Sequence, residues 1–220
     1  SNRCFRDEEF KKAGAIIKED LDKCDLILGV KEIDVNILID NKNYLFFSHT
    51  SKIQADNSEA VQGTPGMDKK DLLKKIVEKN ITLIDYENIR DINGSRYLGF
   101  GRFAGIIGCY NSLALYESFL NNLQLPRAFD VNNYSALKKI IQEKNFSRLR
   151  ILITGDGRVA KGALELLKIS NINQVSKNEF LNNKFNTSVF CNLKTSDYVS
   201  TRLNNKFNLQ HFIKNPKKYN

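Results

Sequence analysis

A glycine-containing segment, Gly155-Asp-Gly-Arg-Val-Ala-Lys-Gly-Ala163, has the residue types that can hold a phosphate group. It lies between a predicted strand at 149–154 and a predicted helix at 159–169. Gly155 permits a tight turn, Gly157 lets the backbone approach a pyrophosphate, and the start of the helix offers N–H groups and a positive dipole end. The pattern predicts a dinucleotide site, with a purely structural turn as the alternative. Its cofactor-binding residues would be Gly155, Gly157, Arg158 and Val159.

The end of the next predicted strand, 173–176, lacks an acidic residue. In dinucleotide-binding domains a carboxylate at this point binds a ribose hydroxyl. Ser176 and Lys177 stand at about that position instead. The sequence therefore leaves NAD and NADP open as cofactors.

A lysine and a histidine follow two neighbouring predicted strands. Lys31 comes after the apolar run 26–30, and His49 after the run 44–48. Ligands of open α/β sheets bind at the carboxyl ends of the strands, where this pattern would bring Lys31 and His49 together. Either side chain could transfer protons to or from a ligand. The alternative for the pair is a structural histidine and a solvated lysine.

Charged residues also follow a third predicted strand, 81–85. Asp85-Tyr-Glu87 lies at its end, and Arg96 and Arg102 come after a turn at Asn93-Gly94. A carboxylate beside a pocket could hold an ammonium group, and a guanidinium could bind a carboxylate through two hydrogen bonds. Surface ion pairs are the alternative.

The elements that must position these residues alternate along the chain. Such alternation is typical of an α/β protein with a doubly wound parallel sheet. A polar loop is predicted at 55–67, with Asp68 as the cap of the helix after it. The predicted helices are 7–21, 69–79, 103–123, 134–144 and 159–169, and the predicted strands are 26–30, 44–48, 81–85, 149–154, 173–176 and 188–193.

Two domains are predicted, because Leu125-Pro126 interrupts the alternation. The first domain, 1–127, would bind substrate, and a connecting helix would lie within 128–148. Residues 149–220 would form a partial Rossmann domain for the dinucleotide, since only 27 residues follow Leu193.

The excess positive charge of the chain, +9 at pH 7, is confined to its C-terminal part. Residues 1–127 hold 18 basic and 19 acidic side chains, whereas 128–220 hold 16 and 6. Because the chain is rich in Asn and Lys throughout and has no nucleic-acid-binding motif, we interpret the charge as compositional and predict no nucleic-acid partner.

The four cysteines are far apart, and neither they nor the two histidines form a metal-ligand pattern. The sequence therefore predicts neither a disulfide framework nor a metal site, which fits a reducing cytoplasmic location. No stretch approaches the roughly 20 apolar residues of a membrane helix, so we expect no membrane association.

Four motifs in order resemble those of lysine-forming saccharopine dehydrogenases and the related lysine-ketoglutarate reductase domains. They are Gly29-Val-Lys31-Glu32, Phe46-Phe-Ser-His49-Thr-Ser-Lys52-Ile-Gln54, Leu83-Ile-Asp-Tyr-Glu87 and Phe100-Gly-Arg-Phe-Ala-Gly-Ile-Ile-Gly108. Both belong to a broader group with alanine dehydrogenase and the transhydrogenase N-terminal region. The resemblance runs from about Arg3 to the end of the chain and includes Gly155 to Ala163.

The resemblance implies a two-domain, NAD(P)-dependent oxidoreductase that interconverts saccharopine with lysine plus 2-oxoglutarate by hydride transfer and imine hydrolysis. Its acid/base residues would be Lys31 and His49, and its substrate-binding residues Glu87, Lys52 and Arg96. The partner is then a small amino-acid substrate, and the group is compatible with a homo-oligomer.

Two other functions remain open at this stage. An alanine or opine dehydrogenase would use the same scaffold, because fold does not fix substrate. A non-catalytic dinucleotide-binding fragment or subunit is also compatible, since family members begin with a further strand and continue past the point that matches Asn220. The resemblance therefore predicts a shortened chain.

Overall fold

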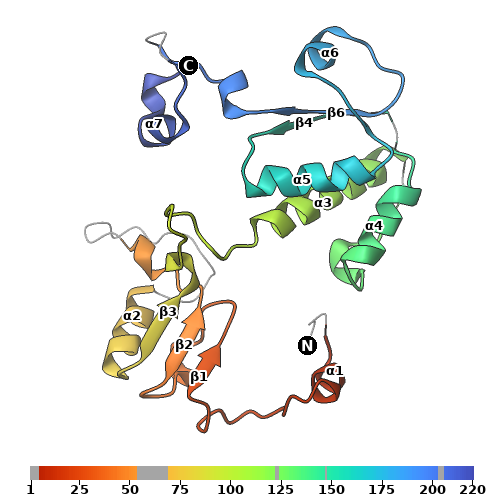
Figure 1. Cartoon of the computed structure of the whole chain (residues 1–220). Helices are drawn as coiled ribbons and strands as arrows, with labels where there is room; N and C mark the ends of the chain where they lie inside the picture. Colours follow the sequence, from red (N-terminus) through yellow and green to blue (C-terminus); the bar gives the residue numbers. More distant parts are fainter. Residues whose placement is uncertain (1–4, 54–68, 122–123, 147, 203–205) are drawn as a thin grey trace. The chain divides into compact units, whose positions relative to one another are not determined.

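The computed structural model describes residues 5–53, 69–121, 124–146, 148–202 and 206–220, without the side chains of Lys52 and Asn121 (Figure 1). The chain divides into two compact units, residues 1–99 and 100–220. The predicted loop 55–67 and the predicted cap Asp68 lie outside the described residues. Each unit has its own parallel sheet, so the α/β class predicted from the sequence is confirmed.

The first unit is built on three parallel strands in the order β1-β2-β3. Helix α2 (Lys69–Glu78) connects β2 to β3, and its Leu72 and Ile76 pack on the sheet. The strands alternate in burial: Ile27, Tyr44 and Phe46 point into this core. Because the strands are parallel, their carboxyl ends lie at one edge of the sheet. The three strands are β1 (Leu26–Leu28), β2 (Asn43–Phe46) and β3 (Thr82–Asp85).

The predicted helix 7–21 is shorter in the structure, where α1 covers Asp7–Lys12. Gly14 has a φ of +91°, a left-handed conformation that ends a helix. Phe10 and Ile16, whose spacing suggests an apolar face, are exposed at 39% and 79%. The periodicity was therefore not sufficient for a long helix, because these side chains stay exposed and an amphipathic helix depends on burial of its apolar face.

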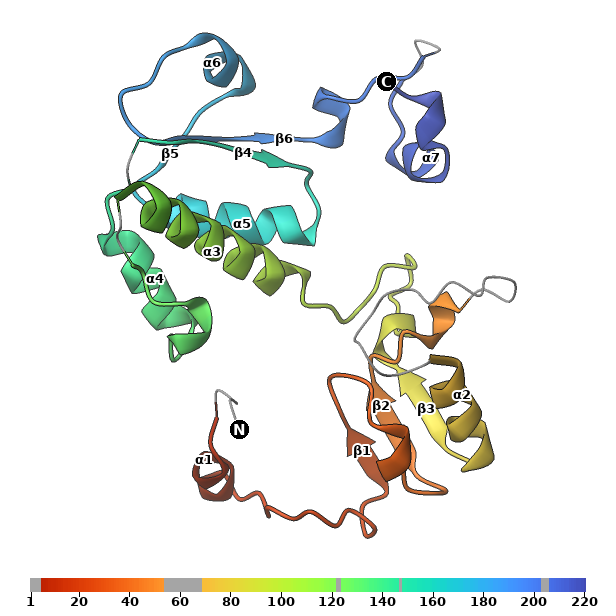
Figure 2. The same cartoon turned by 180° about the vertical axis from the view of Figure 1, so that it is seen from behind.

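The second unit has a parallel sheet in the order β4-β6-β5 (Figure 2). The strands are β4 (Arg150–Thr154), β5 (Asn173–Gln174) and β6 (Val189–Leu193), and the helices are α3 (Gly101–Asn121), α4 (Tyr134–Glu143), α5 (Arg158–Ile169), α6 (Lys177–Asn182) and α7 (Leu209–Lys214). A Rossmann sheet places its first and second strands side by side, whereas here β6 lies between β4 and β5. With only two residues, β5 pairs with Val189 and Phe190 of β6.

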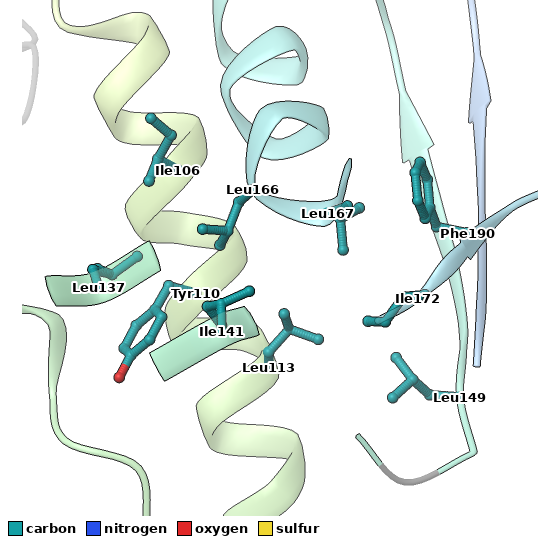
Figure 3. Packing of buried hydrophobic residues seen from close by; sticks show 10 residues of the cluster. All are labelled: Ile106, Tyr110, Leu113, Leu137, Ile141, Leu149, Leu166, Leu167, Ile172 and Phe190. Carbon is teal, nitrogen blue, oxygen red and sulfur yellow. The ribbon is translucent and has the colours of Figure 1, made fainter. Parts of the chain in front are cut away.

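One hydrophobic core joins α3, α4 and α5 to the sheet of the second unit (Figure 3). Ile106 and Tyr110 of α3, Leu166 of α5 and Ile141 of α4 are fully buried there. Phe190 of β6 lies at the sheet side of the cluster. Helix α3 is therefore an integral part of this unit.

The close packing of α3 against α5 depends on one glycine in each helix, Gly105 and Gly162. A Cβ at Gly105 would overlap the Val159 carbonyl oxygen, and a Cβ at Gly162 would overlap the Arg102 carbonyl oxygen. The helix backbones thus touch directly. This contact explains why the compact units divide between residues 99 and 100, whereas the sequence prediction places the first boundary near residue 127.

A cluster of polar side chains links α3, α4 and α5 of this unit. Arg102 donates two hydrogen bonds to Glu165, at 2.7 and 2.6 Å, and the Tyr134 hydroxyl donates a third at 2.6 Å. The Arg102 and Tyr134 hydrogen bonds lower the pKa of Glu165 to about 2, and burial raises the pKa of Tyr134 to about 12. The guanidinium expected to bind a ligand carboxylate is therefore engaged within the protein.

Replacing Glu165 with Gln should lower the free energy of unfolding at neutral pH by about 1 kcal/mol, because the pair is partly exposed. The folded-state pKa lies below the ordinary value of 4.5, so the carboxylate stabilises the fold above pH 4.5 and this contribution is lost as the pH falls towards about 2. Urea unfolding across that pH range should show that the free energies of unfolding of the wild type and the variant become equal as the pH falls. Glu143→Gln, at an exposed position, is the control. A difference in the free energy of unfolding between Glu165→Gln and wild type that stays constant with pH would contradict a stabilising role of the Glu165 carboxylate.

Candidate active site and dinucleotide turn

His49 lies just after β2 and points to a carboxylate that follows β3. Its Nδ1 is 2.8 Å from Oε2 of Glu87. Phe47 stacks on the imidazole, with 6.4 Å between ring centroids, and also packs against Tyr86. The two post-strand segments that the sequence predicts to converge are therefore in direct contact.

Glu87 is buried in the short 3-10 helix η3 (Tyr86–Asn88), where it is 2% exposed. Its Oε1 lies 3.0 Å from Nη2 of Arg96, and its Oε2 faces His49. Both carboxylate oxygens thus have a cationic or N–H partner within the protein. In this arrangement Glu87 orients His49 and Arg96, and it would have to exchange a partner to bind a substrate ammonium group.

Lys31 follows β1 at the same edge of the sheet and is exposed. The main chains on either side are tied, because the Gly29 N–H donates to the Leu45 carbonyl at 2.8 Å and the Phe47 N–H to the Val30 carbonyl at 3.3 Å. The Lys31 amine therefore projects from a segment that is hydrogen-bonded to the one leading to His49.

Glu32, next along the chain, forms an ion pair with Lys69 at 3.4 Å. Burial raises the pKa of Glu32, but a backbone hydrogen bond and the charges of Lys69 and His49 outweigh it, so this pKa lies below its ordinary value. Sequence reasoning missed Lys69, whose only signal is its position at the start of a helix after β2.

The structure describes both the backbone and the side chain of Arg96, but only the backbone of Lys52. Lys52 ends the 3-10 helix η2 (Thr50–Lys52), and its side chain lies outside the described part of the structure. Arg96 is half-exposed and contacts Glu87. The structure therefore brings His49, Glu87 and Arg96 into contact, and it places Lys31 at the same sheet edge.

The glycine turn of the second unit has the geometry expected for a phosphate-binding loop. Gly155 has a φ of +89°, which favours glycine, and its N–H donates to the Leu193 carbonyl at 2.7 Å. Gly157 is the N-cap of α5, and no side chain caps the helix there. A Cβ at Gly157 would meet nothing within 4 Å, so the described residues leave room for a ligand. Arg158 and Val159, both exposed, form the first positions of α5. The turn thus fits a pyrophosphate.

Asn192 holds this turn from the end of β6. Its Nδ2 donates to the carbonyls of Ile153 and Gly155, at 3.0 and 2.9 Å. Sequence reasoning did not single out Asn192, although a polar residue within the apolar run Val189-Phe-Cys-Asn-Leu193 was a usable signal.

Ser176 and Lys177 have local partners. Ser176 caps α6 by accepting from the Glu179 N–H, and Lys177 Nζ donates to the Asp197 carbonyl at 2.7 Å. Neither contact selects between NAD and NADP.

Replacing Asn192 with Leu should weaken about tenfold the binding of the dinucleotide that the sequence predicts at this turn, because the two carbonyls that it holds would lose their donor and the turn would loosen. Isothermal titration calorimetry measures this change. Asn182→Leu, at an exposed α6 position, is the control. Unchanged affinity in Asn192→Leu would contradict a role for Asn192 in the turn.

The described residues contain no cluster of three or more metal-ligating side chains. No helix in the part of the chain that the structure describes is long and apolar enough to cross a membrane.

Comparisons with known proteins agree with the motif order. Residues 1–107 match the family described as the alanine dehydrogenase/PNT N-terminal domain. The chain is 33% identical over 185 residues to the mitochondrial alpha-aminoadipic semialdehyde synthase of Bos taurus, covering 76% of this chain and 19% of that protein. It is 30% identical over 184 residues to the saccharopine dehydrogenase (NAD(+), L-lysine-forming) of Neurospora crassa, covering 77% and 46%.

A solved structure of an L-alanine dehydrogenase has a TM-score of 0.49 and 16% identity, covering 88% of this chain and 50% of that one. The chain spans about a fifth of the synthases and under half of the dehydrogenases that it matches. It belongs to the saccharopine dehydrogenase and alpha-aminoadipic semialdehyde synthase family, within the group that shares its N-terminal domain with alanine dehydrogenase.

Proposed function

We propose that the protein is an NAD(P)-dependent amino-acid oxidoreductase of the saccharopine dehydrogenase type. The reaction would convert saccharopine, water and the oxidised dinucleotide into lysine, 2-oxoglutarate, the reduced dinucleotide and a proton. The observation that carries this proposal is the His49–Glu87–Arg96 cluster, at the sheet edge where Lys31 also lies. Within this family, such a cluster is best explained by proton transfer at a bound amino acid.

The side chains of the first unit have distinct parts in this proposal. With Nδ1 held by Glu87, His49 can exchange protons through Nε2. Lys31, exposed at the same edge, can exchange protons with the secondary amine or with the attacking water. Arg96 keeps part of its guanidinium exposed and could bind a substrate carboxylate. Glu87 would orient His49 and Arg96, unless the substrate displaces one of these two partners.

The glycine turn supports a dinucleotide in the second unit. Gly155, Gly157, Arg158 and Val159 would hold the pyrophosphate, and the bound nicotinamide would accept hydride from the carbon bearing the secondary amine. The name of the Neurospora crassa relative specifies NAD(+), which favours NAD for this chain, while NADP remains the alternative. We also propose that the first unit, residues 1–99, supplies the substrate side and that residues 149–220 of the second unit supply the cofactor side.

Steady-state kinetics test this function on the protein expressed from its complete reading frame. Reduction of NAD(P) should depend on saccharopine, and oxidation of NAD(P)H should require lysine together with 2-oxoglutarate. Faster turnover with alanine, or with pyruvate and ammonia, would replace the proposal with an alanine dehydrogenase. Dinucleotide binding without turnover of any of these substrates would favour the non-catalytic alternative.

A cytoplasmic location and a homo-oligomer remain part of the proposal. The described cysteines Cys24, Cys109 and Cys191 are unpaired, which fits a reducing compartment. The mammalian relatives are named as mitochondrial, so cell fractionation must decide the location. Sedimentation velocity would measure the oligomeric state.

A further inference from the structure

The backbone of His49 has a conformation that side-chain-bearing residues rarely adopt. Its φ is +56° and its ψ +13°, in the left-handed region. Such a conformation persists when the surrounding contacts determine it, and it is found preferentially at functional sites. The contacts that hold His49 this way are therefore part of how the site works.

The two residues flanking His49 are held by one buried hydroxyl. Ser48, which is 0% exposed, donates from Oγ to Oδ2 of Asp85 at 2.5 Å. The Thr50 N–H donates to the same Ser48 Oγ at 3.2 Å, and the Thr50 hydroxyl lies 2.8 Å from it. Since the one Ser48 proton goes to Asp85, the Thr50 hydroxyl must be the donor in that contact. These hydrogen bonds therefore fix the residues on both sides of His49.

The same Asp85 carboxylate also holds the partner of His49. Its Oδ1 accepts the Glu87 N–H at 2.8 Å, and the Glu87 side chain then reaches His49 Nδ1, also at 2.8 Å. Asp85 is 7% exposed, so these bonds are largely shielded from water. The contacts close a ring that runs from Asp85 through Ser48 and His49 to Glu87 and back to Asp85.

We propose that Asp85, acting through Ser48, is a positioning residue for His49. It fixes the left-handed backbone of His49 and the place of Glu87, so that Nδ1 carries the proton and Nε2 is the basic nitrogen. The inference rests on the proposed function only where it assigns proton transfer to His49. The hydrogen-bonding role itself can be measured without turnover.

Nitrogen-15 NMR of the two histidine side chains is the direct test. At alkaline pH, where both imidazoles are neutral, His49 of the wild type should show the Nδ1–H tautomer, because the Glu87 carboxylate accepts that proton. In Ser48→Ala and Asp85→Ala the His49 signals should shift towards the Nε2–H tautomer. His211, the other histidine, bonds to Tyr219 in the second unit and should keep its signals in every variant; His211→Gln assigns the spectra.

Asp85→Asn is the conservative variant. Its amide oxygen can still accept the Glu87 N–H while its NH2 group donates to Ser48, which then donates to Thr50. It should restore most of the Nδ1–H tautomer. Unchanged His49 signals in a folded Asp85→Ala protein would overturn the inference. If Asp85→Ala does not fold, Ser48→Ala decides in its place, because it removes one oxygen atom only.

Kinetics of the complete protein provide a second readout. Ser48→Ala and Asp85→Ala should lower kcat about 100-fold with little change in KM, since misplacing a catalytic group by about 1 Å costs this much, and Asp85→Asn should recover most of the loss. Equal losses for Asp85→Asn and Asp85→Ala would contradict the positioning role. A wild type without turnover would refute the proposed function and leave the NMR outcome to decide this inference.

Discussion

A protein in which Lys31 is replaced by Met and His49 by Gln is expected to lose saccharopine turnover by at least about 10,000-fold. Each removed group is a proton carrier, and one positioned acid or base is worth about 100- to 10,000-fold. The methionine keeps the length of the lysine side chain, and the glutamine amide can still donate to Glu87. NAD(P)H formation in the complete protein measures the loss, and calorimetry should show that the separate glycine turn still binds the dinucleotide.

The control variant carries the same two changes elsewhere. Lys74→Met with His211→Gln alters an exposed lysine of α2, which pairs with Glu78 of the same helix, and the histidine of α7, which bonds to Tyr219 within the second unit. It should retain wild-type turnover within about twofold, as surface changes normally do. Turnover by the Lys31→Met/His49→Gln protein near that of its control would show that neither side chain carries protons, and the proposed mechanism would fail.

The location of the first-unit site could be predicted from the sequence because it depends on a local rule. Apolar runs of strand length identified β1, β2 and β3, and parallel strands bring their carboxyl ends to one edge. Lys31, His49 and Glu87 were therefore placed at that edge in advance. The partner of each side chain could not be predicted, because it depends on how the segments after the strands turn. That Glu87 joins His49 to Arg96 became visible only in three dimensions.

Residues that hold other site residues in place are harder to identify from the sequence. Ser48 stands beside His49 in the sequence, yet its bond to Asp85 spans 37 residues and follows from the register of β2 against β3. Asn192 likewise reaches back to the glycine turn because β6 pairs with β4. Predicting such contacts requires knowledge of the strand order. The observed order β4-β6-β5 differs from the order that a Rossmann pattern implies.

The segment Phe100-Gly-Arg-Phe-Ala-Gly105 shows how a motif can be found correctly and interpreted incompletely. The sequence suggested a guanidinium that could bind a ligand carboxylate, with a surface ion pair as the alternative. In the structure Arg102 binds Glu165 of α5, and Gly105 lies against the first turn of that helix. Its glycines and arginine thus support the helix that follows the glycine turn.

Replacing Gly105 with Ala is accordingly expected to destabilise the second unit by about 3 kcal/mol or more. The added methyl group would overlap the Val159 carbonyl oxygen and crowd the Ala163 nitrogen, which are backbone atoms that cannot change rotamer. The helices would have to separate, and this would loosen the core around Ile106 and Leu166 (Figure 3). Because the two units need not unfold together, amide hydrogen exchange of α5 is the measurement of choice, supported by thermal unfolding.

Gly108→Ala, one turn further along the same helix, is the matched control for this effect. A Cβ at Gly108 would meet nothing within 4 Å, so the substitution should add only the helix propensity of alanine and stabilise α3 by up to about 1 kcal/mol. Gly162→Ala, which meets the Arg102 carbonyl from the α5 side, should resemble Gly105→Ala. Destabilisation by Gly105→Ala together with stabilisation by Gly108→Ala would show that the effect arises from the contact between the helices. Similar stabilities for the two variants would show that the helices do not approach as closely as the structure has them.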